Sequence, residues 1–205
     1  SNPLDPQRTS LWFRSSQEGA DNHRHLDQNS FVLSARGQPL FLDAGYYGQY
    51  GDDAYASAHR RDFAKRSIAH NTIALDGRNG QQRFHTTAQP MIMNELASRR
   101  ARGRILRFVD TPDYGFVVGD AVQAYQQAGY EHGKALRAVV YLRPNVVLVF
   151  DAHDLSGPAR TWSWLFHSLQ QPVDAGGLVT LTAGSAVATV RNLYASPAIA
   201  GRTID

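Results

Sequence analysis

The stretch that decides the fold reads Ala135-Leu136-Arg137-Ala138-Val139-Val140-Tyr141-Leu142, then Arg143-Pro144-Asn145, then Val146-Val147-Leu148-Val149-Phe150-Asp151. Two runs rich in apolar and β-branched residues stand on either side of a short turn that contains proline, which predicts two β-strands. The second run is continuously apolar from Val146 to Phe150, a pattern typical of a strand covered on both faces.

The same pattern of short apolar runs and turn residues continues along most of the chain. The remaining strands are expected at 11–14, 31–35, 40–43, 72–75, 103–109, 115–118, 161–166, 178–181 and 186–190. Because no helical periods alternate with these strands, we expect an all-β fold, an antiparallel β-sandwich. Residues 52–66 are the exception, since their Ala and charge content leaves a short helix or a long ordered loop open. No repeat or linker divides the chain, so we expect a single domain over residues 1–205.

Composition restricts the class of protein and the kinds of site. With 205 residues, 42% of them hydrophobic, the chain is long enough to bury a core, and no run approaches the roughly 20 apolar residues of a membrane span. Cysteine is absent, which excludes disulfides and thiolate ligands, so a metal would need His and carboxylate ligands.

Of the 21 basic residues only Lys65 and Lys134 are lysines, and the others are arginines. Arginine binds carboxylate, sulfate and phosphate groups bidentately, which favours an anionic ligand.

Nucleic acid is not an expected partner, since the arginines are scattered and no nucleic-acid-binding motif accompanies them.

The most unusual local feature is His23-Arg24-His25, because on a strand this spacing points both imidazoles to one face. Asp43 ends an expected strand and His70 begins another segment, and His and Asp are ligand types that zinc accepts. With a tight turn at Arg36-Gly37, His25 would lie about 17 Å beyond the residue opposite Asp43, unless residues 25–29 fold back. Spacing alone therefore leaves both a metal site and a solvent-exposed pair of histidines open.

Three ordered motifs resemble the C-terminal domain of heparinase II/III-like polysaccharide lyases. They are His23-Arg24-His25-Leu26-Asp27-Gln28-Asn29-Ser30-Phe31-Val32-Leu33, Leu40-Phe41-Leu42-Asp43-Ala44-Gly45-Tyr46, and Ala69-His70-Asn71-Thr72-Ile73-Ala74-Leu75-Asp76-Gly77. The strands quoted at the opening and Trp164-Leu165-Phe166-His167 follow in the order of that family, so the resemblance extends over nearly the whole chain.

The resemblance implies a β-sandwich that follows an α/α-toroid, with a polysaccharide cleft between the two. It implies a structural zinc bound by His25, Asp43 and His70, while His23 faces the substrate uronate and a tyrosine, best placed at Tyr55 among several, enters the cleft. No segment of this sequence supplies the toroid, so we expect a C-terminal part of a longer protein that is inactive by itself. The resemblance also implies a periplasmic or secreted location.

The implied reaction is β-elimination on an anionic polysaccharide that contains uronic acid. Loss of the C5 proton requires donors that stabilise the developing enolate, a role that we expect of His23, Asn29, Asn71 or an arginine such as Arg66. Histidine and tyrosine are suited to the acid and base roles. A non-catalytic carbohydrate-binding or scaffolding sandwich remains the alternative, whereas a hydrolase is disfavoured because no carboxylate pair stands out. His23 favours the lyase, because a purely structural module has no need of it.

Overall fold

The computed structural model describes residues 5–16, 25–43, 59–75, 80–81, 102–125, 131–156 and 161–193. Almost all regular structure in these ranges is β-strand, and every strand pair is antiparallel. The strands are β1 Ser10–Arg14, β2 Ser30–Ala35, β3 Gln38–Phe41, β4 Ile73–Leu75, β5 Arg104–Asp110, β6 Tyr114–Asp120, β7 Glu131–Leu142, β8 Val146–Ser156, β9 Trp162–Trp164, β10 Val173–Ala175, β11 Leu178–Ala183 and β12 Ala186–Arg191.

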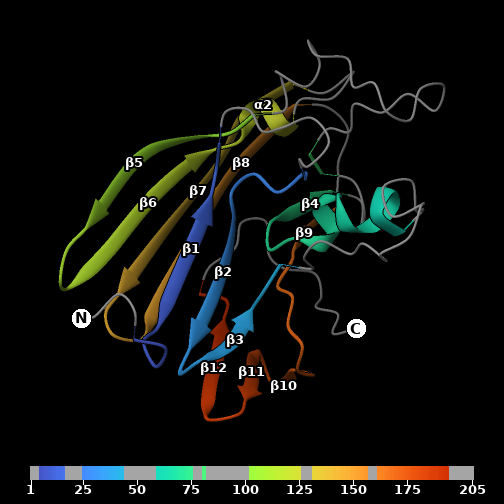
Figure 1. Cartoon of the computed structure of the whole chain (residues 1–205). Helices are drawn as coiled ribbons and strands as arrows, with labels where there is room; N and C mark the ends of the chain where they lie inside the picture. Colours follow the sequence, from blue (N-terminus) through green and yellow to red (C-terminus); the bar gives the residue numbers. More distant parts are fainter. Residues whose placement is uncertain are drawn as a thin grey trace, which may run out of the picture.

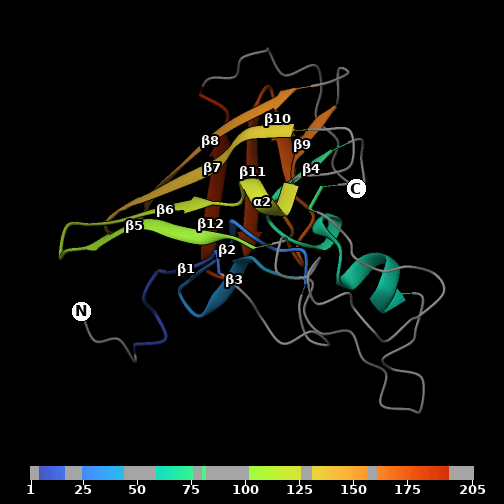
Figure 2. The ribbon, with the colours of Figure 1, turned by 90° about the horizontal axis from the view of Figure 1, so that it is seen from above.

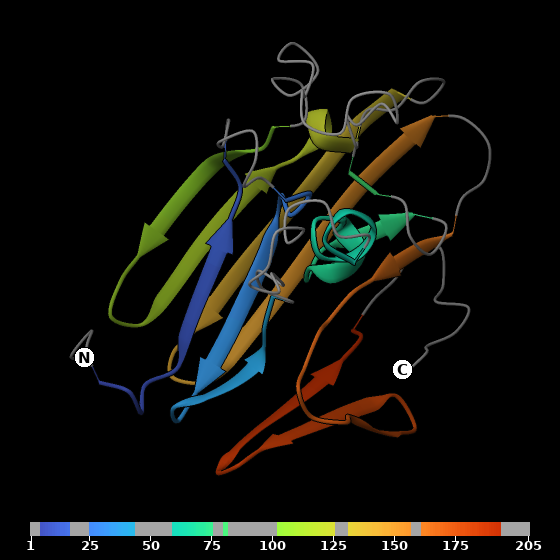
Figure 3. The same cartoon turned by 45° about the vertical axis from the view of Figure 1, so that its right-hand side comes forward.

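The described strands form four sheets, with the orders β5-β6-β7-β8, β1-β2-β3, β10-β11-β12 and β4-β9. The four-stranded sheet forms one layer and β1-β2-β3 lies across it as a second layer (Figures 1 and 2). The β10-β11-β12 sheet lies at the end of the molecule away from the short α2 helix, Val122–Tyr125 (Figure 3). The fold is thus the antiparallel β-sandwich expected from the sequence.

The main core lies between these layers. Its buried side chains come from β2, β3, β11 and β12, and partly buried residues of β1 and β8 pack against them: Phe31, Leu33, Leu40, Phe41, Leu181, Ala183 and Ala186, with Leu11, Phe13, Val147 and Val149 among the packing residues. A second cluster lies at the α2 end and joins β4 to α2 and β7 through Ile73, Leu75, Ala121, Ala124, Tyr125 and Ala135. Tyr125 of this cluster donates through its hydroxyl to the Ile73 carbonyl at 2.8 Å and lies 3.1 Å from Thr72 Oγ1, so the cluster contacts the segment directly after His70 and Asn71.

Among the described residues, only one face of the strand at Val146–Phe150 is covered. The expectation of cover on both faces is therefore wrong within this part of the chain. Val147 and Val149 pack against the core, whereas Val146 and Phe150 on the opposite face are 46% and 55% exposed. The continuous apolar run therefore predicted the strand correctly, but the burial that it predicted for both faces is wrong among the described residues.

A short helical turn occupies part of residues 52–66, the stretch that the sequence left undecided, and a second turn follows it. Residues 52–58 lie outside the described residues, and the chain then forms a π-helical turn at Arg60–Ala64 and a 3-10 turn at Ser67–Ala69. The sequence pattern did not predict α2 or β10. No helix in the described ranges is long and apolar enough to cross a membrane.

Candidate metal centre

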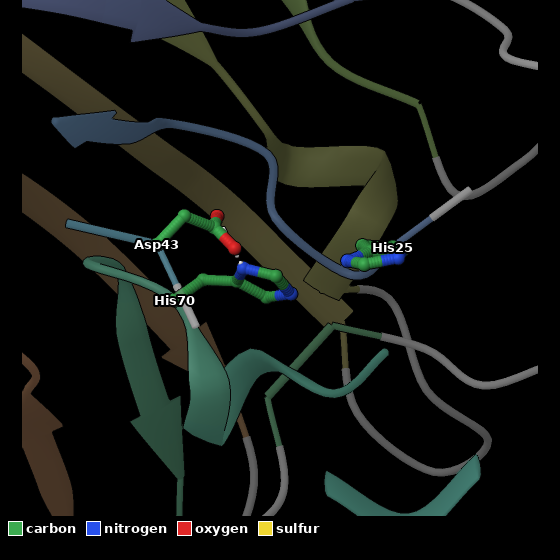
Figure 4. Close-up of side chains that lie close together, drawn as sticks. All are labelled: His25, Asp43 and His70. Atoms are coloured by element: carbon green, nitrogen blue, oxygen red, sulfur yellow. Dashed lines mark hydrogen bonds and ion pairs between the residues drawn. The ribbon is translucent and has the colours of Figure 1, made fainter. Parts of the chain in front are cut away.

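His25, Asp43 and His70 converge from three separate segments of the chain. One ligand atom from each residue lies within 4.8 Å of the other two. Figure 4 shows the His70 ring between the other two residues, with one nitrogen turned to the Asp43 carboxylate. The three ligands expected from the resemblance therefore lie close enough together to bind one ion.

His70 is the most deeply buried of the three. Its Nδ1 lies 2.6 Å from Asp43 Oδ2, a hydrogen bond in which the imidazole donates to the carboxylate. This bond leaves Nε2 as the ring nitrogen with a free lone pair, and Nε2 is buried without a hydrogen-bond partner in the part of the chain that the structure describes. Because an unsatisfied buried polar atom is costly, a metal ligand role at Nε2 fits this position.

His25 is half-buried, and its ring centre lies 5.2 Å from that of His70. Burial, together with the nearby His70, lowers the pKa of His25 to about 4, although the charge of Asp43 opposes this shift; Lys65 and Arg14 are smaller causes in the same direction as burial. The imidazole is therefore neutral near pH 7, the protonation state in which histidine binds a metal ion. Two imidazoles and one carboxylate form a donor set that zinc accepts, so the residues present fit the expected ion.

A sharp reversal before β2 brings His25 back to the other two residues. Ser30 N–H donates to the Asp27 carbonyl, and Asn29 adopts a left-handed backbone with φ of 57°. Asparagine tolerates this conformation better than most residues, which explains why the chain can turn here. Residues 25–29 thus fold back, as assembly of the site requires.

Asp43 is positioned by the hairpin of β2 and β3. Arg36 and Gly37 both have positive φ values, the geometry of a two-residue hairpin turn. A bulge between Leu33 and Ser34 then shifts the register, so that Leu33 pairs with Phe41. Asp43 follows the end of β3 by two residues, and its carboxylate lies beside the His70 ring.

The structure buries both asparagines that were expected to bind substrate. Asn71 is 1% exposed, and its Nδ2 donates to the carbonyls of Phe31 and Leu42 while its Oδ1 accepts from His167 N–H. The Asn71 amide thereby ties the backbone next to His70 to the backbone next to Asp43. Asn29 is 4% exposed, and its Nδ2 donates to the carbonyls of Gly119 and Ala135. These contacts favour a structural role for both amides.

The structure describes only some of the other expected site residues. Arg66 is half-buried and directly precedes the 3-10 turn that leads to His70. Lys65, also half-buried, accepts a hydrogen bond from Leu26 N–H through its carbonyl. His23 and Tyr55 lie outside the described residues, so their positions stay predictions.

A buried ion pair beneath the site was missed by sequence reasoning. Arg137 binds Asp151 in a bidentate manner, with Nε to Oδ1 at 2.7 Å and Nη2 to Oδ2 at 3.0 Å, and the two side chains are 2% and 5% exposed. Arg137 Nη1 also donates to the carbonyls of Asn29 and Asn71. An arginine within an apolar strand was the signal for it, because such a charge requires a buried partner.

Comparisons with known proteins agree with the fold. The sequence profile of the family described as Heparinase II/III-like, C-terminal, matches residues 4–196. The heparan sulfate lyase HepC from Pedobacter heparinus is similar with a TM-score of 0.59 and 19% identity, over 86% of this chain and 24% of that chain. The heparinase III BT4657 gene product has a TM-score of 0.60 and 16% identity, with coverage of 86% and 24%. No curated protein sequence matches the chain.

At these identities the solved structures show a shared fold. The chain spans about a quarter of the length of each of them. The profile match, in contrast, covers nearly the whole chain and includes all three segments that carry His25, Asp43 and His70. The chain therefore belongs to the Heparinase II/III-like, C-terminal family.

Proposed function

We propose that this chain is the sandwich part of a polysaccharide lyase that cleaves an anionic, uronate-containing polysaccharide by β-elimination, and that it carries a structural zinc. The observation that carries the proposal is the convergence of His25, Asp43 and His70, where the buried Nε2 of His70 has no hydrogen-bond partner among the described residues. Membership in a family whose solved relatives include a heparan sulfate lyase supports the lyase class.

In the proposed reaction a base removes the C5 proton of the uronic acid, the electrons form the C4–C5 double bond, and the C4–O bond breaks. The leaving oxygen takes a proton from an acid, and donors at the carboxylate stabilise the enolate that develops. We assign His23 and Tyr55 to the reacting sugar. Arg66 is a candidate for the uronate carboxylate, since it is half-buried and not fully enclosed.

The zinc would act as an organiser of the site. Bound by His25, Asp43 and His70, it would tie together the segments before β2, after β3 and before β4, and so fix His23, two residues from a ligand. The acid, base and remaining donors would come from a preceding α/α-toroid of the same protein. A periplasmic or secreted location is part of this proposal and rests on the resemblance alone.

We expect the purified protein to contain about one zinc per chain, since the described residues offer one such ligand group. Elemental analysis after dialysis against metal-free buffer measures the content, and zinc addition to chelator-treated protein measures its recovery. A content below about one fifth of an equivalent, with no uptake on addition, contradicts the zinc proposal, because structural zinc sites bind too tightly to lose their ion in dialysis.

We expect the isolated 205-residue chain to fold without measurable lyase activity. Base, acid and carboxylate donors must converge within hydrogen-bond reach of one sugar, and this chain supplies one wall of the proposed cleft. Ultraviolet absorbance of the unsaturated product on several uronic polysaccharides gives the rate, with circular dichroism as the control for folding. Robust product formation would overturn the division of the site between two domains.

His23 and His25 are expected to have different roles in the full-length enzyme. His23→Ala should leave zinc content and melting temperature unchanged yet lower turnover by about 10²-fold, the effect of losing one transition-state donor. His25→Ala should lose zinc and stability together, with activity falling as a consequence. Zinc content, melting temperature and initial rate are compared for both variants. Zinc loss in His23→Ala, or full activity, shows the assignment of this pair to be wrong.

A further inference from the structure

The segment that carries His25 has no strand partner, because β2 begins only at Ser30. Its backbone is held instead by a set of individual hydrogen bonds. Leu26 N–H donates to the Lys65 carbonyl at 2.9 Å, and Ser67 Oγ donates to the Leu26 carbonyl at 3.0 Å. Two residues further on, the backbone of Gln28 is held by a side chain from a distant part of the chain, Gln81.

Gln81 binds the main chain of Gln28 at both of its polar groups. Gln28 N–H donates to Gln81 Oε1 at 2.8 Å, and Gln81 Nε2 donates to the Gln28 carbonyl at 2.7 Å. The side-chain amide therefore supplies the donor and the acceptor that a neighbouring strand would supply. Gln81 is 4% exposed, so water does not compete for these bonds.

The same residue is tied to the segment that carries His70. Gln81 N–H donates to Ser67 Oγ at 3.1 Å, and Ser67 begins the 3-10 turn that ends next to His70. A Cβ at Gly80 would lie 2.9 Å from Ser67 Cβ, so glycine is what permits this close approach. Thr72, two residues after His70, donates through Oγ1 to the Gln28 carbonyl that Gln81 also binds.

The geometry points to Gln81 as a positioning residue that fixes the backbone of His25 relative to that of His70 and thereby sets the affinity and coordination geometry of the metal centre. This inference rests on the zinc site of the proposed function. It assigns Gln81 no contact with the metal or with substrate. Its effect is on the distance between two ligands, because a shift of either backbone changes the donor arrangement that the ion requires.

The test compares three variants of the full-length protein with the wild type. Gln81→Leu keeps a similar side-chain volume and removes both hydrogen bonds to Gln28. Leu181→Ala is the control for stability, since Leu181 is a buried core residue of β11 outside the metal centre. Gln170→Leu is the matched control for the substitution itself, because Gln170 is exposed.

Zinc affinity is measured by competition with a chelator, and the visible spectrum of the Co²⁺-substituted protein reports coordination geometry. Gln81→Leu is expected to weaken zinc binding by about 10- to 100-fold, the range for supporting residues of a metal site, and to alter the Co²⁺ spectrum. Leu181→Ala should lower the melting temperature with affinity and spectrum unchanged. Gln170→Leu should match the wild type in all three measurements.

The outcomes separate this inference from the function on which it rests. If the wild type binds neither Zn²⁺ nor Co²⁺, the zinc proposal fails and the role of Gln81 fails with it. If the wild type binds and Gln81→Leu binds with equal affinity and an unchanged spectrum, only the positioning role is wrong. If Gln81→Leu does not fold, Gln81→Glu is measured, since it keeps the acceptor for Gln28 N–H and lacks the donor. Wild-type affinity and spectrum in that variant would also overturn the inference.

Discussion

Replacement of His70 by alanine is expected to lower zinc affinity by about 10²- to 10³-fold. Structural zinc sites with four ligands bind with roughly 10–16 kcal/mol, so one ligand contributes on the order of 3 kcal/mol, and each 1.4 kcal/mol is tenfold in affinity. His70 is the ligand whose loss should matter most, because its Nε2 is buried without another partner among the described residues and its Nδ1 orients Asp43.

The stability of the variant is expected to depend only weakly on zinc. Zinc that binds only the folded protein raises its stability by about 2.7 kcal/mol when present at 100 times its dissociation constant, and a site weakened 10²-fold or more retains at most about 0.4 kcal/mol of this at the same zinc concentration. Thermal unfolding with zinc and with chelator measures it, alongside affinity. His59→Ala is the matched control, since His59 is exposed and outside the ligand group. If His70→Ala bound zinc with wild-type affinity, His70 would not be a zinc ligand.

Arg137→Met is expected to destabilise the chain by about 3–5 kcal/mol, the usual cost of removing one partner from a buried ion pair. Asp151 would keep its charge with Trp164 Nε1 as a remaining donor, and the carbonyls of Asn29 and Asn71 would each lose a hydrogen bond. Urea unfolding of the 205-residue chain gives the change in the free energy of unfolding.

Two further variants make the interpretation of that result specific. Arg191→Met, at an exposed position of β12, is expected to change stability by no more than about 0.5 kcal/mol. A double variant with Arg137→Met and Asp151→Leu removes the buried charge altogether, yet should remain less stable than the wild type, because the two carbonyls still lack their donor. A cost below about 1 kcal/mol for Arg137→Met contradicts a structural role for the pair.

The strands were predictable because their signals are local. The alternation of apolar runs with turns such as Arg36-Gly37 depends on nearby residues, and the structure has a strand at each expected place, with bounds shifted by a few residues. The bulge between Leu33 and Ser34 and the left-handed Asn29 were not predictable from that pattern, since each depends on how distant segments pack. These two irregular features are the ones that bring Asp43 and His25 to His70.

The ligand trio was predictable from the resemblance and not from spacing, because residues far apart along the chain converge only through the fold. The Arg137–Asp151 pair, in contrast, was open to prediction from the sequence. A turn at residues 143–145 pairs Leu142 with Val146, and five residues further from the turn on each strand Arg137 pairs with Asp151. Gln81 offered no such signal, because a single glutamine in a polar stretch looks like any surface residue.

The two hydrogen bonds from Arg137 to the backbone of Asn29 and Asn71 also bear on when the three candidate ligands can converge during synthesis. All three candidate ligands leave the ribosome within the first 70 residues of this chain. The backbone beside them is held by a side chain that appears 66 residues after Asn71, and by its partner Asp151 later still. Because the β7–β8 hairpin is synthesised after the candidate ligands, and contacts between such distant residues form slowly, we expect the three residues to reach their final arrangement only once that hairpin has formed.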